Sequence, residues 1–451
     1  MAMNAVPSIS LAQEPTEKVK LNSESKEAQS QSLGMLDDMR EILSEYYYDP
    51  KLHGIDVKAR VEAAKTRVKS MQYNWQMYRV LVQLLMDFND SHTRMLLPSR
   101  TDHFQYGVGW QMIGDDCYVT GVTKDSDANA QGVEIGDQIL SIGKFNPTRA
   151  DLWKINYLIY RLDPSKTLDL KIKKPDGQTK SLTIKAKTQT DKEFFAEVKA
   201  KREKRKDNKA RDKEDAQDFK CREVNKDLIA CHLETFSTEK DTIDKMMKQV
   251  AKYPKFILDL RGNGGGYVET EQYLLSHFFD KEVKILDLVT KEKTETRKTK
   301  VLGSDKLYKG DVSVLIDSNS ASASEITAKV LQLEKRAKIY GDYSSGSVMT
   351  SIGVPFKSLL SAHADAAIIR VGMSVTIGDV IMSDRTRLEK VGVVPDEVLQ
   401  PLAVAFKMKL DAVLAYAASK MGVNISPEEA GKFYFITEKE EESDVDAADN
   451  K

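Results

Sequence analysis

The most informative segment of this 451-residue chain reads Phe256-Ile257-Leu258-Asp259-Leu260-Arg261-Gly262-Asn263-Gly264-Gly265-Gly266. Its first half is a short apolar run typical of a buried strand, its second half is rich in glycine, and a helical pattern follows. Glycines between a strand and a helix expose backbone amides at the helix N-terminus, which favours an anion or oxyanion site. A structural turn fits the same residues. A phosphate-binding loop is disfavoured, because no lysine-serine pair follows the glycines and the G-x-G-x-x-G spacing is absent.

Strands and helices alternate on both sides of this segment. In chain order the runs are Leu228 to Leu233, Thr242 to Lys252, Phe256 to Leu260, a helix after Gly266, Val312 to Ile316, Ser324 to Glu334, and Lys338 to Tyr340. This alternation predicts an α/β domain with parallel strand pairing. We assign residues 219–421 to that core, which ends in a helix from Val398 to about Met421. The acidic residues 422–451 are expected to form a disordered tail.

A second motif follows the apolar run Val312 to Ile316 and reads Ser318-Asn319-Ser320-Ala321-Ser322-Ala323-Ser324-Glu325. Serines that alternate with alanine allow one hydroxyl to project at the turn, while the small neighbours let a substrate backbone approach. The alternative is a helix cap, since Ser322 and Glu325 fit an S-x-x-E capping box.

Two smaller units precede the core. Residues 33–103 show apolar side chains at helical spacing, as at Leu36, Met39 and Leu43, which predicts a helical N-terminal unit. Residues 104–188 show short alternating strands punctuated by glycine, expected at Tyr106 to Trp110, Cys117 to Val122, Gln138 to Ile142, Leu168 to Lys173 and Ser181 to Lys185. Among them the string Ala130-Gln131-Gly132-Val133-Glu134-Ile135-Gly136-Asp137-Gln138-Ile139-Leu140 resembles part of a PDZ domain. The fold class expected is therefore multidomain α/β, with a PDZ-like β-rich domain inserted between the helical unit and the core.

Composition and charge exclude several classes of protein. The chain has 68 Lys and Arg against 69 Asp and Glu, so nothing global points to nucleic acid or an anionic membrane. Residues 189–218 are expected to be a charged linker or helix. The interleaved charges of residues 199–218 lack aromatic neighbours, which argues against a nucleic-acid arm. The longest apolar stretches, such as Val80 to Met86, fall far short of the ~18 residues that a membrane span requires.

The first 32 residues are polar and lack apolar periodicity, so residues 1–32 are expected to be disordered. The alternative is a clipped export signal. Ser10-Leu11-Ala12 has the small residues of a signal-peptidase site, although neither a basic region nor a full apolar stretch precedes it.

Three cysteines are too few for a disulfide framework or a four-cysteine zinc site. Cys221 and Cys231 flank Asn225-Lys226-Asp227, and a hairpin that pairs Val224 with Leu228 places the two cysteines opposite each other. A cross-strand disulfide is possible there. Two reduced cysteines are the alternative, favoured in a reducing cytosol and disfavoured after export.

The glycine-rich and serine-rich motifs, in this order behind a PDZ-like unit, resemble the C-terminal processing peptidases, also called tail-specific proteases, and the related tricorn core protease. The resemblance covers roughly residues 35–400 and includes Leu388-Glu389-Lys390-Val391-Gly392-Val393-Val394-Pro395-Asp396. It implies that Ser322 is the nucleophile. It also implies oxyanion donors at the amide of Ala323 and at that of Gly264 or Gly265. The family is mostly extracytoplasmic, which favours a periplasmic or secreted location over the cytoplasm.

The chain departs from the processing peptidases in the loop Gly341-Asp342-Tyr343-Ser344-Ser345-Gly346-Ser347. The family places its general-base lysine directly after the second glycine, and Ser347 stands there instead. The nearby lysines are Lys335, Lys338 and Lys357. Each is expected to be a solvated surface residue, whereas a lysine must be desolvated to act as a base at neutral pH.

The tricorn branch uses a histidine base preceded by serine and supported by a distant glutamate. Asp90-Ser91-His92-Thr93 supplies the Ser-His pair and Glu389 matches the glutamate, which gives a tetrad of Ser322, His92, Ser91 and Glu389. A histidine near its ordinary pKa of ~6.5 can take the serine proton and return it to the leaving amine. The alternatives stay open. Lysine-dependent relatives also carry a D-x-H-T histidine, Ser91 fits a turn or a cap, and Glu389 fits an exposed loop charge.

The sequence thus predicts a serine endopeptidase that cuts unfolded or C-terminally exposed polypeptides. The PDZ-like unit would capture the substrate C-terminus with the loop Gly107, Val108, Gly109 and Trp110, unless it serves only as a lid or hinge. A catalytically inactive scaffold that binds peptides, or a Ser-Lys enzyme with a relocated lysine such as Lys357, are the rival hypotheses. No metal or organic cofactor is implied, polypeptides are the expected partners, and the oligomeric state is left open.

Overall fold

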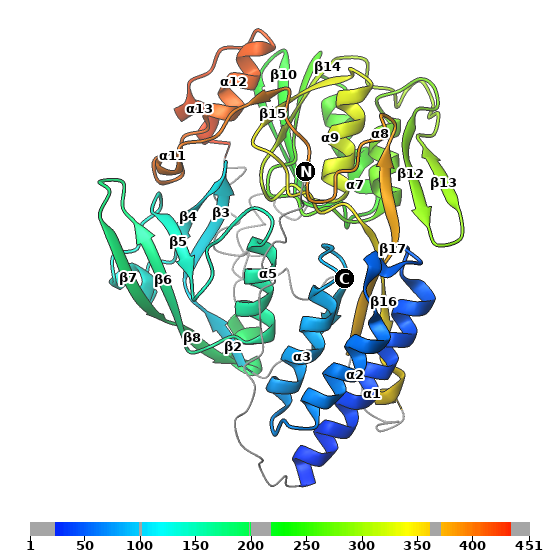
Figure 1. Ribbon diagram of the computed structural model, residues 1–451. Helices are drawn as coiled ribbons and strands as arrows, with labels where there is room; N and C mark the ends of the chain where they lie inside the picture. The colour runs from blue at the N-terminus through cyan, green and yellow to red at the C-terminus, as the bar shows by residue number, and fades with distance from the viewer. Residues whose placement is uncertain (1–22, 99–101, 198, 200–217, 361–370, 434–451) are drawn as a thin grey trace, which may run out of the picture.

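The computed structural model describes residues 23–98, 102–197, 199, 218–360 and 371–433. Helices near the N-terminus, a β-rich unit and an α/β core form three parts, and helices near the C-terminus lie between the β-rich unit and the core (Figure 1). The mixed α/β class expected from the sequence is confirmed. The expected signal or disordered segment before residue 23 and most of the charged stretch 199–218 lie outside the described residues, whereas residues 191–197 are helical.

The core is built on a six-stranded sheet of order β18-β15-β14-β11-β10-β9. Its strands are β9 (Phe219–Asn225), β10 (Leu228–Leu233), β11 (Lys255–Asp259), β14 (Asp311–Ile316), β15 (Ala337–Gly341) and β18 (Glu397–Val398). All neighbours from β10 to β18 are parallel, and only β9 joins antiparallel. The predicted parallel alternation is confirmed, with strand bounds within one residue of those expected for β10, β11, β14 and β15. The carboxyl ends of β11, β14 and β15 therefore meet at one edge of the sheet.

Helices cover both faces of this sheet. One face packs against α7 (Lys240–Val250), α8 (Val268–Ser276) and α9 (Ala323–Leu333), and the other against α12 (Ala412–Lys420). Helix α7 shows why, since Ile243, Met246, Met247 and Val250 recur on one side and are buried. Side chains of β11 alternate likewise, because Phe256 and Leu258 join the first core and Ile257 joins the second.

A second sheet of order β1-β17-β12-β13 joins the core to the N-terminal helices, and β16 also pairs with β17. Its strands are β1 (Arg94–Leu96), β12 (Lys284–Thr290), β13 (Thr294–Lys298), β16 (Thr350–Pro355) and β17 (Gly372–Met382). The 11-residue strand β17 is the shared element. Its second half, residues 378–382, pairs with β12 of the core, whereas Met373 and Val375 in its first half pack among the N-terminal helices.

The N-terminal unit contains α1 (Ser23–Tyr46), the 3-10 turn η1 (Leu52–Gly54), α2 (Val57–Val68) and α3 (Asn74–Met86), against which α10 (Lys357–Leu360) packs. The expectation that residues 1–32 are disordered is wrong for residues 23–32, which form the start of α1. Ala28 and Ser32 are buried there, and the Gln29 amide donates to the carbonyl of Met71 at 2.8 Å. Small and polar side chains make these contacts, so this part of the helix has no apolar periodicity from which it could be predicted.

The β-rich unit has a five-stranded antiparallel sheet of order β3-β4-β5-β6-β7 with a separate core. Its elements are β2 (Asp102–Gln105), β3 (Val108–Ile113), β4 (Asp116–Val122), α4 (Asp127–Ala130), β5 (Gln138–Ile142), α5 (Leu152–Tyr157), the π-helical turn η2 (Leu158–Leu162), β6 (Thr167–Lys173), β7 (Thr179–Lys185) and β8 (Lys187–Thr190). Strand β3 lies at the edge of the sheet and β2 pairs separately with β8.

The C-terminal segment corrects two expectations. The single helix expected from Val398 to Met421 is divided into α11 (Ala403–Met408) and α12, because Lys409 adopts a left-handed conformation with φ 55° and Asp411 caps α12. The tail expected to be disordered from residue 422 instead continues to residue 433 with α13 (Pro427–Gly431), where a Ser426 cap starts the helix and Ala430 is buried. Residues 434–451 lie outside the described part.

Strands β9 and β10 form the expected hairpin, and Cys221 lies opposite Cys231 in a disulfide. The expected pairing of Val224 with Leu228 is wrong, because Leu228 lies opposite Asn225 and the register shifts at the next residue. The side chain of Asn225 accepts the amides of Asp227 and Leu228, each at 2.9 Å, which tightens the turn by one residue. The bulge restores the register before the cysteines.

No helix in the described ranges is long and apolar enough to cross a membrane.

The disulfide closes a loop between residues ten positions apart, so it should stabilise the folded chain by about 2–3 kcal/mol. We expect dithiothreitol to lower the free energy of unfolding of the wild type by this amount in urea titrations, and to leave Cys221→Ser unchanged. Peptide mapping without reductant should recover the linked pair. Equal stability of the wild type with and without reductant would contradict the prediction.

Candidate active site

Ser322 lies at the turn between β14 and α9, directly before the first helical residue. Its backbone has φ 56° and ψ −118°, a conformation that costs energy for any residue with a Cβ and persists only where the surroundings impose it. The amide of Ala321 donates to the carbonyl of Asn263 at 2.9 Å, and the amide of Ser345 donates to the carbonyl of Ser320 at 2.9 Å. Loops after β11 and β15 therefore hold this turn from both sides.

The glycine loop after β11 lies directly against Ser322. A Cβ on Gly265 would lie 2.7 Å from the Cβ of Ser322, so only glycine fits at this approach. The amide of Gly265 donates to Oδ1 of Asn263 at 2.8 Å, so this amide is already paired within the loop. Two other amides near Ser322, those of the exposed Gly264 and of Ala323, the first residue of α9, have no hydrogen-bond partner among the described residues. Of the two glycines left open by the sequence, Gly264 is the one with an available donor.

Glu325 is buried below the serine turn and accepts four hydrogen bonds. Its Oε2 accepts the amides of Ser322 and Ser347 at 2.9 Å each, and its Oε1 accepts the amide of Gly346 at 2.7 Å and the hydroxyl of Ser344 at 2.6 Å. Burial raises the pKa of Glu325 to about 7 against the opposing effect of these four donors. The glutamate half of the expected capping box is present, but the same carboxyl also anchors the loop after β15.

Ser91, His92 and Glu389 form a continuous hydrogen-bonded chain. Ser91 Oγ lies 2.7 Å from His92 Nδ1 and donates to Oε2 of Glu389 at 3.0 Å, and the Ser91 amide donates to Oε1 of Glu389 at 2.9 Å. Oε2 of Glu389 also accepts the amide of Val348 at 2.9 Å. Burial raises the pKa of Glu389, and its three donors act in the opposite direction. Glu389 is therefore not the exposed loop charge of the alternative hypothesis.

Asp90 fixes the turn that carries Ser91 and His92. Its buried carboxylate accepts the amides of His92 at 3.0 Å and Thr93 at 2.6 Å, together with the hydroxyls of Tyr47 at 2.9 Å and Thr376 at 2.8 Å. Tyr47 belongs to the N-terminal helical unit and Thr376 to β17. The histidine turn is thus held on the strand that joins the helical unit to the core.

The serine turn and the histidine turn meet at the Ser347–Val348 peptide. The amide of Ser347 shares Oε2 of Glu325 with the amide of Ser322, and the next amide, that of Val348, binds the Oε2 of Glu389 that also accepts Ser91 Oγ. Residue 347, where the processing peptidases have their lysine, therefore lies between the two glutamates as a serine.

The lysines considered as alternative bases are all solvated. Lys335 and Lys338 are exposed. The side chain of Lys357 is 70% exposed, on α10, and lies 3.7 Å from the carboxylate of Glu41 on α1. None is desolvated, as a lysine must be to act as a base at neutral pH.

Of the four residues expected to receive a peptide, Gly107 directly precedes β3, and Val108, Gly109 and Trp110 are its first three residues. Gly107 has φ 68°, and its carbonyl accepts the amide of Thr123 at 2.9 Å. Val108 is buried, and the Trp110 indole donates to Oδ1 of Asn156 at 3.0 Å. At the other end of β3, the carbonyl of Met112 accepts the hydroxyl of Ser318 at 2.7 Å. This edge strand therefore leads to the serine turn.

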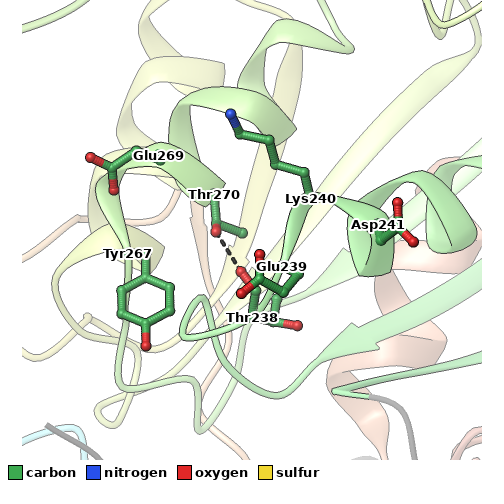
Figure 2. Close-up of a pocket in the computed structure, with 7 residues that line it drawn as sticks. All are labelled: Thr238, Glu239, Lys240, Asp241, Tyr267, Glu269 and Thr270. Carbon is green, nitrogen blue, oxygen red and sulfur yellow. Dashed lines mark hydrogen bonds between the residues drawn. The ribbon is translucent and has the colours of Figure 1, made fainter.

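A cavity of about 490 Å³ lies beside Tyr267, the residue that directly follows the glycine loop (Figure 2). It is lined by Thr238, Glu239, Lys240, Asp241, Tyr267, Glu269 and Thr270. The amide of Phe236 donates to the carbonyl of Gly265 at 2.8 Å, and the amide of Tyr267 donates to the carbonyl of Phe236 at 3.1 Å. The wall of the cavity thus continues the backbone that holds the glycine loop, but none of the expected site residues lines it.

Two important residues are missed by sequence reasoning. Glu325 is visible only through its S-x-x-E spacing, which indicates a contact with Ser322 but not with amides 21 and 22 positions away. Asp90 stands in the Ser-His motif, and its place before hydroxyl residues is typical of an Asx turn. Within the described ranges no group of three or more His, Cys, Asp or Glu side chains is arranged to hold a metal ion.

Comparison with known proteins identifies relatives of this chain. Residues 228–399 match the model of peptidase family S41. The carboxy-terminal processing protease CtpB of Bacillus subtilis is 26% identical over 277 residues, which are 59% of this chain and 52% of that protein. Chloroplastic carboxyl-terminal-processing peptidase 1 of Arabidopsis thaliana is 23% identical over 386 residues, covering 80% and 71%. The match thus spans about half the length of the Bacillus relative.

Solved structures show the same fold. The photosystem II D1 C-terminal processing protease aligns over 82% of this chain and 94% of its own, with a TM-score of 0.51 and 18% identity. Mature CPAF aligns over 84% and 94%, with a TM-score of 0.59 and 13% identity. At these identities the likeness concerns the fold.

The raised pKa of Glu325 predicts a pH-dependent effect on stability. The folded chain retains a proton on Glu325 that the unfolded chain releases between about pH 4.5 and about pH 7, so stability decreases as the pH rises through this interval. Glu325→Gln abolishes this titration. We expect the variant to gain stability relative to the wild type, on the order of 3 kcal/mol, between pH 4.5 and pH 7.5 in urea titrations.

Glu292→Gln, at an exposed glutamate, is the control and should follow the wild type across the whole interval. A loss of stability of Glu325→Gln relative to the wild type as the pH rises would show that the four donors outweigh burial.

Proposed function

The chain belongs to peptidase family S41, and from this we infer that it is a serine endopeptidase that cleaves unfolded or C-terminally exposed polypeptides. The observation that carries the inference is the hydrogen-bonded chain Glu389–Ser91–His92, which is linked to the serine turn through the consecutive amides of Ser347 and Val348. Ser322 is the nucleophile and His92 is its base in this proposal, with Ser91 and Glu389 as positioning residues. The proposal is thus a histidine mechanism like that of the tricorn branch, in a chain that has Ser347 where the processing peptidases have their lysine.

The hydrogen bonds support a defined tautomer of His92. An ionised Glu389 can only accept, so the Ser91 hydroxyl donates its proton to Glu389. Ser91 Oγ then accepts from Nδ1 of His92, which places the ring proton on Nδ1. Nε2 carries the lone pair and is the atom that takes the proton of Ser322 Oγ.

In this proposal the reaction has two stages, acylation and deacylation. Ser322 Oγ forms a bond to the scissile carbonyl carbon as its proton moves to His92. The carbonyl oxygen becomes an oxyanion that accepts from the amides of Ala323 and Gly264. His92 gives its proton to the leaving amine, the C–N bond breaks, and an acyl-enzyme remains. Water attacks this ester with His92 again as base, which releases the new C-terminus and restores Ser322.

Substrate capture is proposed for the β-rich unit, which we regard as PDZ-like. Strand β3 is the end strand of its sheet in the described part of the chain, so its outer edge can pair with an extended peptide, and the loop before it can receive the terminal carboxylate. The hydrogen bond from Ser318 to Met112 and another from Asn319 to the side chain of Gln111 join the far end of β3 to the serine turn. A peptide on this edge would therefore extend toward Ser322.

An extracytoplasmic location is proposed as well. A disulfide between Cys221 and Cys231 persists in oxidising compartments and is rare in a reducing cytosol. The Arabidopsis relative carries a chloroplastic name.

The mechanism predicts which residues are needed for reaction with a fluorophosphonate probe and for degradation of casein. Ser322→Ala should abolish both, because it removes the nucleophile. His92→Ala should lower both by at least about 10²-fold, as expected for the loss of a general base. Lys357→Ala should retain wild-type rates, since this lysine is solvated. Both rates are measured by gel fluorescence and peptide release.

A Ser-Lys enzyme would instead lose activity in Lys357→Ala and retain it in His92→Ala. Absence of labelling and cleavage in the wild type, with peptide binding preserved, would support the inactive scaffold.

Carboxylate capture predicts a dependence on the substrate terminus. In Ser322→Ala, which cannot cleave, a peptide with a free C-terminal carboxylate should bind at least about tenfold more tightly than its C-terminal amide, about 1.4 kcal/mol. Fluorescence anisotropy with a labelled peptide measures both affinities. Equal affinities would indicate that the β-rich unit serves as a lid or hinge.

A further inference from the structure

Arg261 begins the glycine loop and is held by two carboxylates from distant parts of the chain. Its Nε and Nη2 donate to Asp259 at 2.9 and 2.6 Å, and its Nη1 and Nη2 donate to Asp411 at 3.0 and 2.7 Å. All three side chains are largely buried, with Arg261 4% exposed, Asp259 0% and Asp411 10%. The guanidinium keeps the pKa of Asp259 below its usual range despite burial, which normally raises it.

From this arrangement we infer that Asp411, at the N-terminus of α12, is a positioning residue that sets the oxyanion donor at Gly264 through Arg261. The inference rests on the proposed function. Asp411 is 150 positions from Arg261 along the chain and lies on the helix that covers the opposite face of the sheet from α9.

The connection from Asp411 to Gly264 is short and consists of buried and partly buried hydrogen bonds. The next residue after Arg261, Gly262, donates its amide to Oδ1 of Asp317 at 2.9 Å. Asn263 donates its amide to the carbonyl of Leu260 at 3.1 Å and its side-chain amide to that of Leu233 at 2.8 Å. The loop is therefore fixed at Arg261 and at Asn263, and Gly264 is the first residue beyond the second point.

Asp411 is itself fixed by the C-terminal segment. Its Oδ1 accepts the amide of Leu414 at 2.9 Å as the cap of α12, and its amide donates to the carbonyl of Pro427 at 2.9 Å. The carboxylate is thus placed by α12 and α13 before it meets Arg261. This gives the helices after residue 402 a role at the active site, although none of their residues touches the substrate in the proposed mechanism.

The buried charges explain why the effect should reach catalysis. With both carboxylates present, each of the four hydrogen bonds donated by Arg261 has its acceptor. Loss of one carboxylate leaves a buried N–H group of the guanidinium unpaired. Arg261 then has to shift toward another acceptor, and the loop that begins at this residue shifts with it. An oxyanion donor acts mainly in the transition state, so a small displacement lowers kcat and leaves substrate binding nearly unchanged.

The test uses Asp411→Asn in the full chain. The amide oxygen can still cap α12, but the charge and one acceptor for Arg261 are lost. We expect kcat for a fluorogenic peptide with a free C-terminus to fall about 10- to 100-fold, with KM within about twofold of the wild type. Ser426→Ala is the matched control, since it removes a cap from α13 in the same segment without touching Arg261. The control should lower the melting temperature and retain kcat.

Wild-type kcat in Asp411→Asn, or equal losses of kcat in both folded variants, would overturn the inference. If Asp411→Asn does not fold, Asp411→Glu, which keeps the charge but alters the reach, provides the same comparison of kcat with KM. Failure of the proposed function is separate, because the wild type would then not hydrolyse the peptide, or Ser322→Ala would hydrolyse it as fast as the wild type.

Discussion

The site depends on two glutamates that bind consecutive amides of one loop. Glu325 binds the amide of Ser347 and Glu389 binds that of Val348. Through its other acceptor bonds Glu325 holds the turn of Ser322, and Glu389 holds Ser91 and thereby the ring of His92. Ser322 and His92, the proposed nucleophile and base, come from distant parts of the chain, and this loop is bonded to the turns that carry both of them.

The parallel sheet provides the frame for this arrangement. Loops after β11, β14 and β15 leave the same edge of the sheet, where the first supplies Gly264, the second Ser322 and the third Ser347. The close approach of Gly265 to Ser322 and the strained backbone of Ser322 are both tolerated because these loops are bonded to one another. His92 lies on the turn before β1. Strand β1 pairs with β17, which joins it to the core.

Sequence patterns predict what depends on short-range periodicity. The strands β10, β11, β14 and β15 and the helix α9 follow from apolar runs, and the Ser91–His92–Glu389 association follows from motif resemblance. Contacts between distant polar residues leave no such pattern, which is why the bonds of Glu325 to the loop after β15 and of Asp411 to Arg261 were not predicted. Local side-chain hydrogen bonds likewise changed the register at Asn225, and small buried residues concealed the start of α1.

The central claim is that His92, and not a lysine, is the general base for Ser322. A crystal structure of the chain phosphonylated at Ser322 tests it most directly. The account predicts Nε2 of His92 within hydrogen-bonding distance of the modified Ser322 side chain or its phosphonyl group, and a phosphonyl oxygen between the amides of Gly264 and Ala323. A lysine ammonium in the position of the imidazole, or an imidazole turned away from the adduct, would contradict it.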